Sequence, residues 1–306
     1  MNPAFSVIFL TTLIGAGQGL FLALFGAELM GAAAPSFLAI GAGVALALTA
    51  LGLVASFFHL GHPERAWRAA AMWRTSWLSR EVIALPLFMA GLAAWGGAHA
   101  LGWQVSPLLG AAVVLACALL FVCTAMIYAS IKFLREWASP LTLVNYTLLG
   151  CASGFTLATL LAALAAPALV RPYGLGAAVL TLTALAARVA SLRRNARLKP
   201  KSTLQSALGV KHPRIVQTSQ GFMGGSFNTR EFFHGQTALV LRNVKWLFLG
   251  FGFVVPAAML LATGSAASPA WFGLAFAVQY LGLLAERWYF FAQANHPQNL
   301  YYQAIS

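Results

Sequence analysis

Long stretches of this chain carry no charged residue, and its nineteen Lys and Arg fall in a few short islands between them. Inside a bilayer every backbone amide must find its partner within the chain, so long apolar stretches become membrane-spanning helices. A run of about 20 apolar residues crosses the hydrocarbon core, and this chain has room for about eight such runs. The sequence therefore predicts an all-α, polytopic integral membrane protein, a bundle of eight transmembrane helices that forms a single membrane domain over residues 1–306.

The composition excludes a water-soluble protein. Only 8% of the residues are charged, and all six acids are Glu, whereas soluble domains carry about 25% charged residues. A net charge of +13 also suits nucleic-acid-binding proteins. Here, however, the basic residues flank the apolar runs, where membrane topology already accounts for them. We therefore expect contact with membrane lipid and no binding of nucleic acid.

Eight spans are expected where the apolar runs lie, with Pro residues near several helix starts, because a missing amide costs least there. The expected ranges are 5–30, 36–60, 81–101, 107–130, 140–165, 172–190, 245–263 and 269–291. In the first of them, Gly15 and Gly19 are two small residues one helical turn apart. This spacing favours a close helix crossing over a ligand site.

The distribution of positive charge predicts the orientation. All Lys and Arg except Arg171 lie in or within two residues of the second, fourth and sixth connections, or near the C-terminal end. By the positive-inside rule this side is cytoplasmic. With an even number of spans both termini are cytoplasmic as well, and we expect the protein in the bacterial cytoplasmic (inner) membrane.

The sixth connection, residues 191–244, is the one long polar segment. Its Gly-rich stretch lacks the Gly-Lys-Ser/Thr of a phosphate-binding loop. One interpretation is a solvated loop that faces lipid headgroups. We prefer a docking platform for a cytoplasmic partner, because Arg and aromatic side chains are typical anchors of protein interfaces. The candidate docking residues are Arg193, Arg194, Phe222, Phe227, Arg230, Phe233 and His234.

The sequence does not indicate a metal or haem site. Cys117, Cys123 and Cys151 lie in apolar runs, without the spaced group of four thiolates that holds an iron–sulfur cluster. The histidines offer no pair at matching depth for haem, and no cluster with zinc-ligand spacing. We expect no haem, no iron–sulfur cluster and no metal in this chain.

The densest polar segment is the second connection, between His59 and Glu81. His59 lies at the end of the second predicted helix, and Glu81 begins the third helix. Both groups are therefore expected at the cytoplasmic edge of the bilayer. Histidine titrates near neutral pH, and burial raises the pKa of a Glu toward that range. Such groups suit the reduction of a quinone, which needs proton donors. In the alternative interpretation Glu81 caps its helix and His59 bonds a carbonyl.

Ionisable residues inside spans are functional candidates by default. Glu286 with Arg287 in the last helix indicates an inner-edge ion pair with the loops. Glu28, near the outer end of the first helix, is expected at the outer headgroups. The other polar residues noted within the spans are Gln18, Asn145, Tyr146 and Gln279.

One motif resembles the anchor-subunit family of dimethyl sulfoxide reductase, and the similarity extends over essentially the whole chain. It reads His59-Leu60-Gly61-x-Pro63-x-Arg65-Ala66, followed by Ser79-x-Glu81. The resemblance implies a membrane anchor without haem that exchanges electrons with quinone. It also implies two partners, a molybdopterin catalytic subunit and a four-cluster iron–sulfur subunit. The family's quinone-associated His and Glu correspond to His59 and Glu81.

Within that family the membrane-bound sulfite dehydrogenases keep their catalytic subunit in the cytoplasm and pass electrons to quinone. Because His59 and the docking platform are expected on the cytoplasmic side, the resemblance favours this branch, with ubiquinone or menaquinone as the acceptor. Arg65 and Arg68 would then stabilise negative charge on the reduced ring or contact the iron–sulfur subunit. No catalytic residue for the molybdenum reaction is expected here.

Two alternatives stay open at this stage. The first is the anchor of a dimethyl-sulfoxide-reductase-type enzyme that oxidises menaquinol, since the same residues serve either direction of electron flow. The second is a secondary transporter, which predicts broken helices and a polar site at the membrane midplane. The nearly uniform Ala, Leu, Gly and Phe of the mid-span regions disfavours the transporter.

Overall fold

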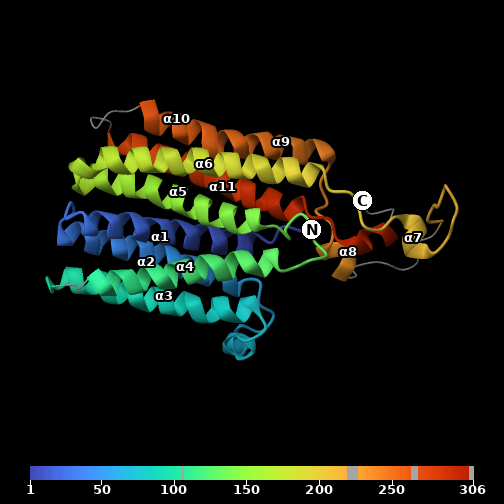
Figure 1. Ribbon diagram of the computed structural model, residues 1–306, viewed down its shortest axis with the longest axis horizontal. Helices are drawn as coiled ribbons and strands as arrows, with labels where there is room; N and C mark the ends of the chain where they lie inside the picture. The colour runs from blue at the N-terminus through green and yellow to red at the C-terminus, as the bar shows by residue number, and fades with distance from the viewer. Residues whose placement is uncertain (105–106, 219–226, 263–267, 303–306) are drawn as a thin grey trace.

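The computed structural model describes residues 1–104, 107–218, 227–262 and 268–302, and all regular secondary structure in these ranges is helical. Long helices run side by side as a bundle (Figure 1). They are α1 (Phe5–Leu29), α2 (Pro35–Phe57), α3 (Trp77–Ala100), α4 (Pro107–Ala129), α5 (Pro140–Ala165), α6 (Val170–Ala196), α9 (Ala238–Leu249), α10 (Val255–Ala262) and α11 (Pro269–Ala292). The short helices are η1 (Pro63–Met72), η2 (Pro167–Leu169), α7 (Leu204–Leu208), α8 (Phe227–Glu231), η3 (Gly250–Val254) and η4 (Pro297–Tyr301).

Seven described segments are long and apolar enough to cross a membrane. They are α1 to α5, the segment Pro167–Ala196 that contains α6, and the continuous helical segment Ala238–Ala262. α11 is not among them, since polar residues such as Gln279, Glu286 and Arg287 lower its mean hydropathy. The all-helical, multi-pass membrane class is thus confirmed, while the predicted count of eight spans is not.

Several helix ends differ from the sequence-based ranges. α3 begins at Trp77 rather than 81, because the hydroxyl of Ser76 accepts from the amide of Ser79 (3.4 Å) and caps the helix. α6 continues to Ala196, and the next long helix already begins at Ala238. Hydropathy detects only the turns inside the hydrocarbon core, so polar turns that protrude beyond it were missed. In the structure the long connection therefore covers residues 197–237.

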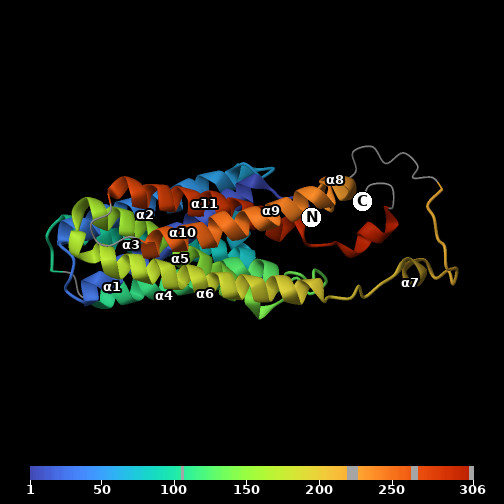
Figure 2. The same cartoon turned by 90° about the horizontal axis from the view of Figure 1, so that it is seen from above.

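The two ends of the bundle differ in charge. The connections 58–76, 130–139 and 197–237 lie at one end, together with the N-terminus and the tail after α11 (Figure 1). We call this the basic end, because these connections and the adjoining helix turns carry nearly all Lys and Arg. Figure 2 shows that the segment with α7 and the C-terminal tail project beyond the helices there. Near the opposite end lies Arg171, at the start of α6.

α1 joins the two halves of the bundle, since it packs against α2 and α4 as well as α5 and α11. Gly15 and Gly19 of α1 lie against Gly150 and Gly154 of α5, and a Cβ on Gly19 or Gly154 would meet the backbone of the other helix. The predicted close crossing is therefore confirmed.

A second close approach positions α11. Gly282 of this helix lies against Gly252, within the single π-helical segment η3 that interrupts Ala238–Ala262. A Cβ on Gly282 would meet the backbone of Gly252, so a side chain at Gly282 would separate the two helices. As a result α11 packs against both α5 and α9, and its charged residues face the interior of the bundle.

Candidate functional site

His59 lies just beyond the end of α2, at the basic end. Its backbone amide donates to the carbonyl of Ser56 (3.4 Å), and its side chain is exposed. Partial burial nevertheless lowers the pKa of its imidazole from the ordinary value. The neighbouring side chains of Phe57, Phe58 and Leu60 are also exposed. An imidazole beside an open apolar surface fits a lipid-soluble ring whose carbonyl needs a hydrogen-bond donor.

Glu81, by contrast, points into the bundle. It is 7% exposed, and its carboxylate accepts a hydrogen bond from the hydroxyl of Thr124 in α4 (2.5 Å). Among the described residues, no hydrogen bond connects it to His59. The alternative that Glu81 caps α3 is wrong, because Ser76 caps this helix and Glu81 lies a full turn inside it. The two predicted quinone residues thus face different surroundings.

The carboxyl group of Glu81 lines a small cavity between α1, α3, α4 and α5. The other lining residues are Thr11, Ile14, Gly15, Gln18, Phe121, Thr124 and Tyr146. Several of these carry hydroxyl or amide groups, so polar groups border the cavity although most of its wall is apolar. Glu81 is thus an ionisable group that borders this cavity.

Arg65 and Arg68 lie on η1, whose residues are largely exposed. The Nε of Arg65 lies 3.6 Å from the carboxylate of Glu64, and the guanidinium carbon of Arg68 lies 5.4 Å from the ring centroid of Trp67. Trp67 itself is 71% exposed. An exposed surface of Arg and Trp is typical of a protein or membrane interface. These arginines therefore lie outside the cavity of Glu81.

Arg80 holds this connection against α3, a role that the sequence analysis missed. Its Nε donates to the carbonyl of Trp73 (2.9 Å) and its Nη2 donates to the carbonyl of Arg74 (2.8 Å). Its guanidinium carbon lies 4.1 Å from the ring centroid of Trp77. Arg and Trp alternate in this segment of the sequence, but this pattern does not reveal which pairs meet.

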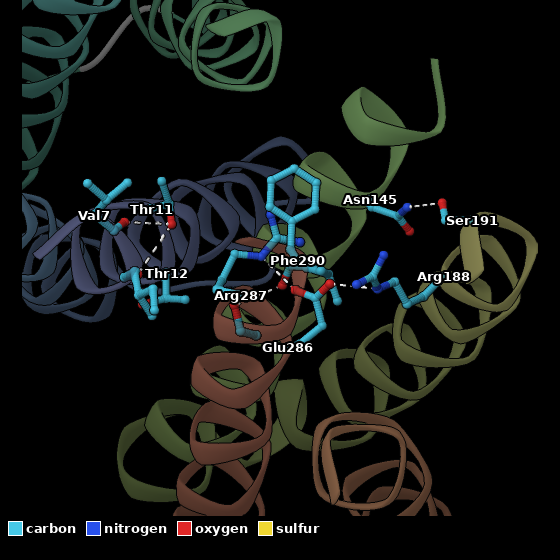
Figure 3. Close-up of polar contacts among 12 residues, drawn as sticks. Val7, Thr11, Thr12, Asn145, Arg188, Ser191, Glu286, Arg287 and Phe290 are labelled. Atoms are coloured by element: carbon cyan, nitrogen blue, oxygen red, sulfur yellow. Dashed lines mark hydrogen bonds and ion pairs between the residues drawn. The ribbon is translucent and has the colours of Figure 1, made fainter. Parts of the chain in front are cut away.

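The largest correction concerns Glu286 and Arg287, which were expected with the loops at the inner edge. Glu286 is fully buried, with Oε1 2.7 Å from Nε of Arg188 in α6 (Figure 3). Its Oε2 accepts a hydrogen bond from Nε of Arg287 (2.6 Å), whose guanidinium carbon lies 4.0 Å from the ring centroid of Tyr146. The bundle interior accepts these charges because they are paired. The sequence analysis did not single out Arg188. A cation inside an apolar run nevertheless indicates a buried partner of opposite charge.

Further polar contacts connect the same helices. Nδ2 of Asn145 in α5 donates to the hydroxyl of Ser191 in α6 (2.7 Å, Figure 3). Nε2 of Gln279 in α11 donates to the hydroxyl of Thr181 (2.9 Å). The second half of the bundle is therefore held together by buried polar groups as well as by apolar packing.

Glu28 was expected among the outer headgroups; it lies in the last turn of α1, where its carboxylate faces α3. Its carboxylate accepts from Nε1 of Trp95 (3.0 Å) and lies 2.9 Å from Nε2 of His99. The side chains of Glu28 and His99 are only 14% and 9% exposed. Because Trp95 and His99 are one turn apart on α3, both reach the same carboxylate. This cluster joins α1 to α3 at the end opposite the basic end.

The predicted docking residues that the structure describes belong to the basic end, but they differ in accessibility. Arg193 and Arg230 are exposed. Arg194 is half-buried, and it donates to the carbonyls of Arg135 (3.0 Å) and Ala138 (3.2 Å). It therefore holds the connection between α4 and α5, and its guanidinium is not free for a partner.

Phe233 and His234 follow α8 and are half-buried. The ring of Phe233 packs against Tyr302 of the tail, with centroids 6.1 Å apart. Burial lowers the pKa of His234, and the nearby N-terminal amine lowers it further. Phe222 and the side chain of Phe227 lie outside the described residues.

A groove of about 680 Å³ opens at the basic end between the α4–α5 connection, the segment after α6 and the tail. Its volume is within the range of small-ligand sites, about 300–1,000 Å³. The charged side chains that line it are Lys132, Arg135, Glu136, Lys199 and Lys201. The groove is therefore a positively charged surface that was not singled out from the sequence.

In the described ranges no group of three or more His, Cys, Asp or Glu is arranged to hold a metal ion. Cys117 and Cys123 are buried free thiols, and Cys151 is a half-buried one. The amide of Gln18 donates to the carbonyl of Cys117 (2.8 Å), so this segment serves packing between α1 and α4.

Two comparisons with known proteins bear on these sites. The family described as DMSO reductase anchor subunit (DmsC) matches residues 1–212, well over half of the chain. The C subunit of the sulfite dehydrogenase of Allochromatium vinosum is 53% identical over 328 aligned positions, which cover both chains in full. Both matches agree with the resemblance carried by the segment from His59 to Glu81.

Proposed function

This chain belongs to the DMSO reductase anchor-subunit family, and we propose on that basis that it is the quinone-reactive anchor of a sulfite dehydrogenase. Membership in an anchor family implies catalytic partner subunits. In the proposal these are a molybdopterin subunit that oxidises sulfite and a four-cluster iron–sulfur subunit. The full-length identity to a subunit of a sulfite dehydrogenase supports this branch.

The proposed orientation has the basic end and both termini in the cytoplasm, because positive charge concentrates on the cytoplasmic side of membrane proteins. α11 then forms an eighth span of the bacterial inner membrane, packed against α5 and α9 (Figure 2). Reporter fusions at the two termini test this arrangement. A reporter that is active only in the cytoplasm should work at both ends, and activity at only one end would contradict the eighth span.

The proposed site of quinone reduction is His59, and its place beside exposed apolar side chains at the basic end is the observation that carries the proposal. The imidazole donates a hydrogen bond or proton to a ring carbonyl, while Phe57, Phe58 and Leu60 cover the apolar ring. A bound ubiquinone or menaquinone accepts two electrons and two protons. Glu81 relays protons from the interior, and this chain holds neither haem nor an iron–sulfur cluster.

The docking partner in this proposal is the iron–sulfur subunit. It approaches the basic end, where Arg65 and Arg68 of η1 are exposed and the groove beside Lys199 is positively charged. Electrons then arrive close to His59. Arg65 and Arg68 contact this subunit or offset negative charge on the reduced ring.

Purified complexes with single substitutions test the proposal. His59→Ala and Glu81→Lys should reduce the rate of quinone reduction by at least about 100-fold, the usual cost of losing a proton-transfer group. Sulfite oxidation with an artificial dye acceptor should stay unchanged, because it needs only the catalytic subunits. Arg171→Ala, at the opposite end, is the control. Loss of the catalytic subunits from the membrane, instead of lost quinone coupling, would indicate a structural role.

A second candidate reverses the electron flow, and the description of the matching family favours it. In that case the chain oxidises menaquinol for a reductase that acts on a sulfoxide or a similar acceptor. The same residues would serve. Sulfoxide reduction by the purified complex with quinol, without sulfite oxidation, would establish this direction.

A further inference from the structure

Three small cavities in the bundle share one lining residue, Tyr146 of α5. The first has a volume of about 10 Å³ and reaches Glu136 and Asn195 at the basic end. The second, of about 20 Å³, lies between Arg287 and polar residues of α1. The third, of about 10 Å³, is the cavity of Glu81. Tyr146 therefore connects the surface of the basic end with a carboxyl group inside the bundle.

Polar atoms along the first cavity lack a hydrogen-bond partner within the protein. They include Oδ1 of Asn145, Nη2 of Arg188 and the hydroxyl of Tyr146, which faces the guanidinium of Arg287 and the hydroxyl of Tyr128. Buried polar atoms are almost always hydrogen-bonded, to protein or to ordered water. Each cavity has room for about one water molecule and offers several polar neighbours. Water is thus the ligand that these cavities fit.

We propose that Tyr146 and these cavities form a proton path from the basic end to Glu81. The inference rests on the proposed function, in which Glu81 supplies protons to the quinone. A proton enters beside Glu136 and crosses the first cavity on water. The hydroxyl of Tyr146 accepts this proton and releases its own to water in the third cavity, from which Glu81 takes it up.

The chemistry of this path is balanced. At each transfer one O–H bond breaks and one forms, so Tyr146 is unchanged after every passage. Glu81 gives up its proton toward the quinone and is ready for the next one. Two passages supply the two protons, and the iron–sulfur subunit of the proposed complex supplies the two electrons.

The charges beside the path favour Glu81 as its end point. The charged groups that line the first cavity or pair with its lining residues are Glu136, Arg188, Arg194, Glu286 and Arg287. Together these groups carry one net positive charge. The carboxylate of Glu286 is already ion-paired with two guanidinium groups, those of Arg188 and Arg287. Among the described residues, Glu81 has only the neutral hydroxyl of Thr124 as a hydrogen-bond partner. A proton that passes Tyr146 is therefore drawn onward to this carboxylate.

Tyr146→Phe in the purified complex tests the path. The substitution keeps the ring that packs on Arg287 and removes the hydroxyl that relays the proton. We expect kcat for quinone reduction to fall about tenfold, with unchanged KM for quinone and unchanged dye-linked activity. Tyr173→Phe is the matched control, because its buried hydroxyl donates to the carbonyl of Ala23 (3.0 Å) and lines none of the three cavities. A wild-type kcat in Tyr146→Phe would overturn the proposal.

The wild-type complex provides a test that does not depend on how a variant folds. Rates of quinone reduction are measured in mixtures of H₂O and D₂O. A relay through several O–H groups gives a curved dependence on the deuterium fraction. A straight line, as expected for one transferred proton, would contradict the path.

The outcomes separate this inference from the function on which it rests. If the wild-type complex does not reduce quinone, or Glu81→Gln retains the full rate, the proposed function fails. If Glu81→Gln loses the rate while Tyr146→Phe keeps it, the quinone site stands and only the path through Tyr146 is wrong.

Discussion

Glu81 and Glu286 are both buried carboxylates within a few turns of the basic end, yet their partners are opposite in kind. Glu286 lies between the guanidinium groups of Arg188 and Arg287, at 2.7 Å and 2.6 Å. Glu81 accepts a hydrogen bond from a neutral hydroxyl, that of Thr124, and borders a small cavity that Gln18 and Tyr146 also line. Protonating Glu286 would leave two buried cations without their counter-ion, whereas protonating Glu81 removes a buried charge. Burial alone therefore does not tell a structural carboxylate from a proton carrier, but the partners do.

The comparison predicts its largest effect for Glu286→Ala. This change leaves Arg188 and Arg287 as uncompensated charges in the bundle, at a cost of about 3–5 kcal/mol of folding free energy. The thermal unfolding temperature of the detergent-solubilised chain should fall sharply, and less protein should integrate into the membrane. Wild-type stability in this variant would show that the two arginines find other partners, which removes the contrast with Glu81.

Glu81→Gln should have the opposite profile. The amide oxygen can still accept from Thr124 and the volume is kept, so we expect a stability loss below about 1.5 kcal/mol. The group that carries the proton is gone, and quinone reduction should fall by at least about 100-fold. Unfolding temperature and quinone assays on the same preparation measure both. A stability loss as large as that of Glu286→Ala would make Glu81 a structural residue.

Thr124→Val sharpens the comparison with a smaller effect. The substitution keeps the shape and removes the one hydroxyl that donates to Glu81, which leaves a buried acceptor unpaired at a cost of about 1–3 kcal/mol. Quinone reduction should fall by only a few fold, since the carboxyl group is still present. A rate loss equal to that of Glu81→Gln would show that the hydroxyl itself carries the proton.

The smallest effect is expected at the opposite end, for Glu28→Gln. The amide oxygen keeps the hydrogen bond from Trp95 and weakens the contact with His99, so the cost should be about 1 kcal/mol. Quinone reduction should be unchanged, because this cluster is remote from the basic end. A clear loss of the quinone rate would show that the two ends of the bundle are coupled.

Much of the fold was predictable, because it follows from solvation. Apolar runs near 5–30 and 107–130 had to become helices, and the pair Gly15 and Gly19 indicated a close crossing before its partner helix was known. The helix ends at Trp77, Ala196 and Ala238 were not predictable from hydropathy, since capping and protruding polar turns determine them. The motif around His59 indicated the family from the residues alone.

The sequence by itself determined the class, the family and the positively charged end of this protein, because these depend on composition and order along the chain. Only the tertiary structure decided that Glu286 meets Arg188, that Glu81 faces Tyr146 and its cavity, and that Glu28 pairs with His99. The physical reason is that helices apolar on every side carry no stripe that marks their inward face. Which faces meet then depends on close packing at small residues such as Gly19 and Gly282, which brings distant segments together.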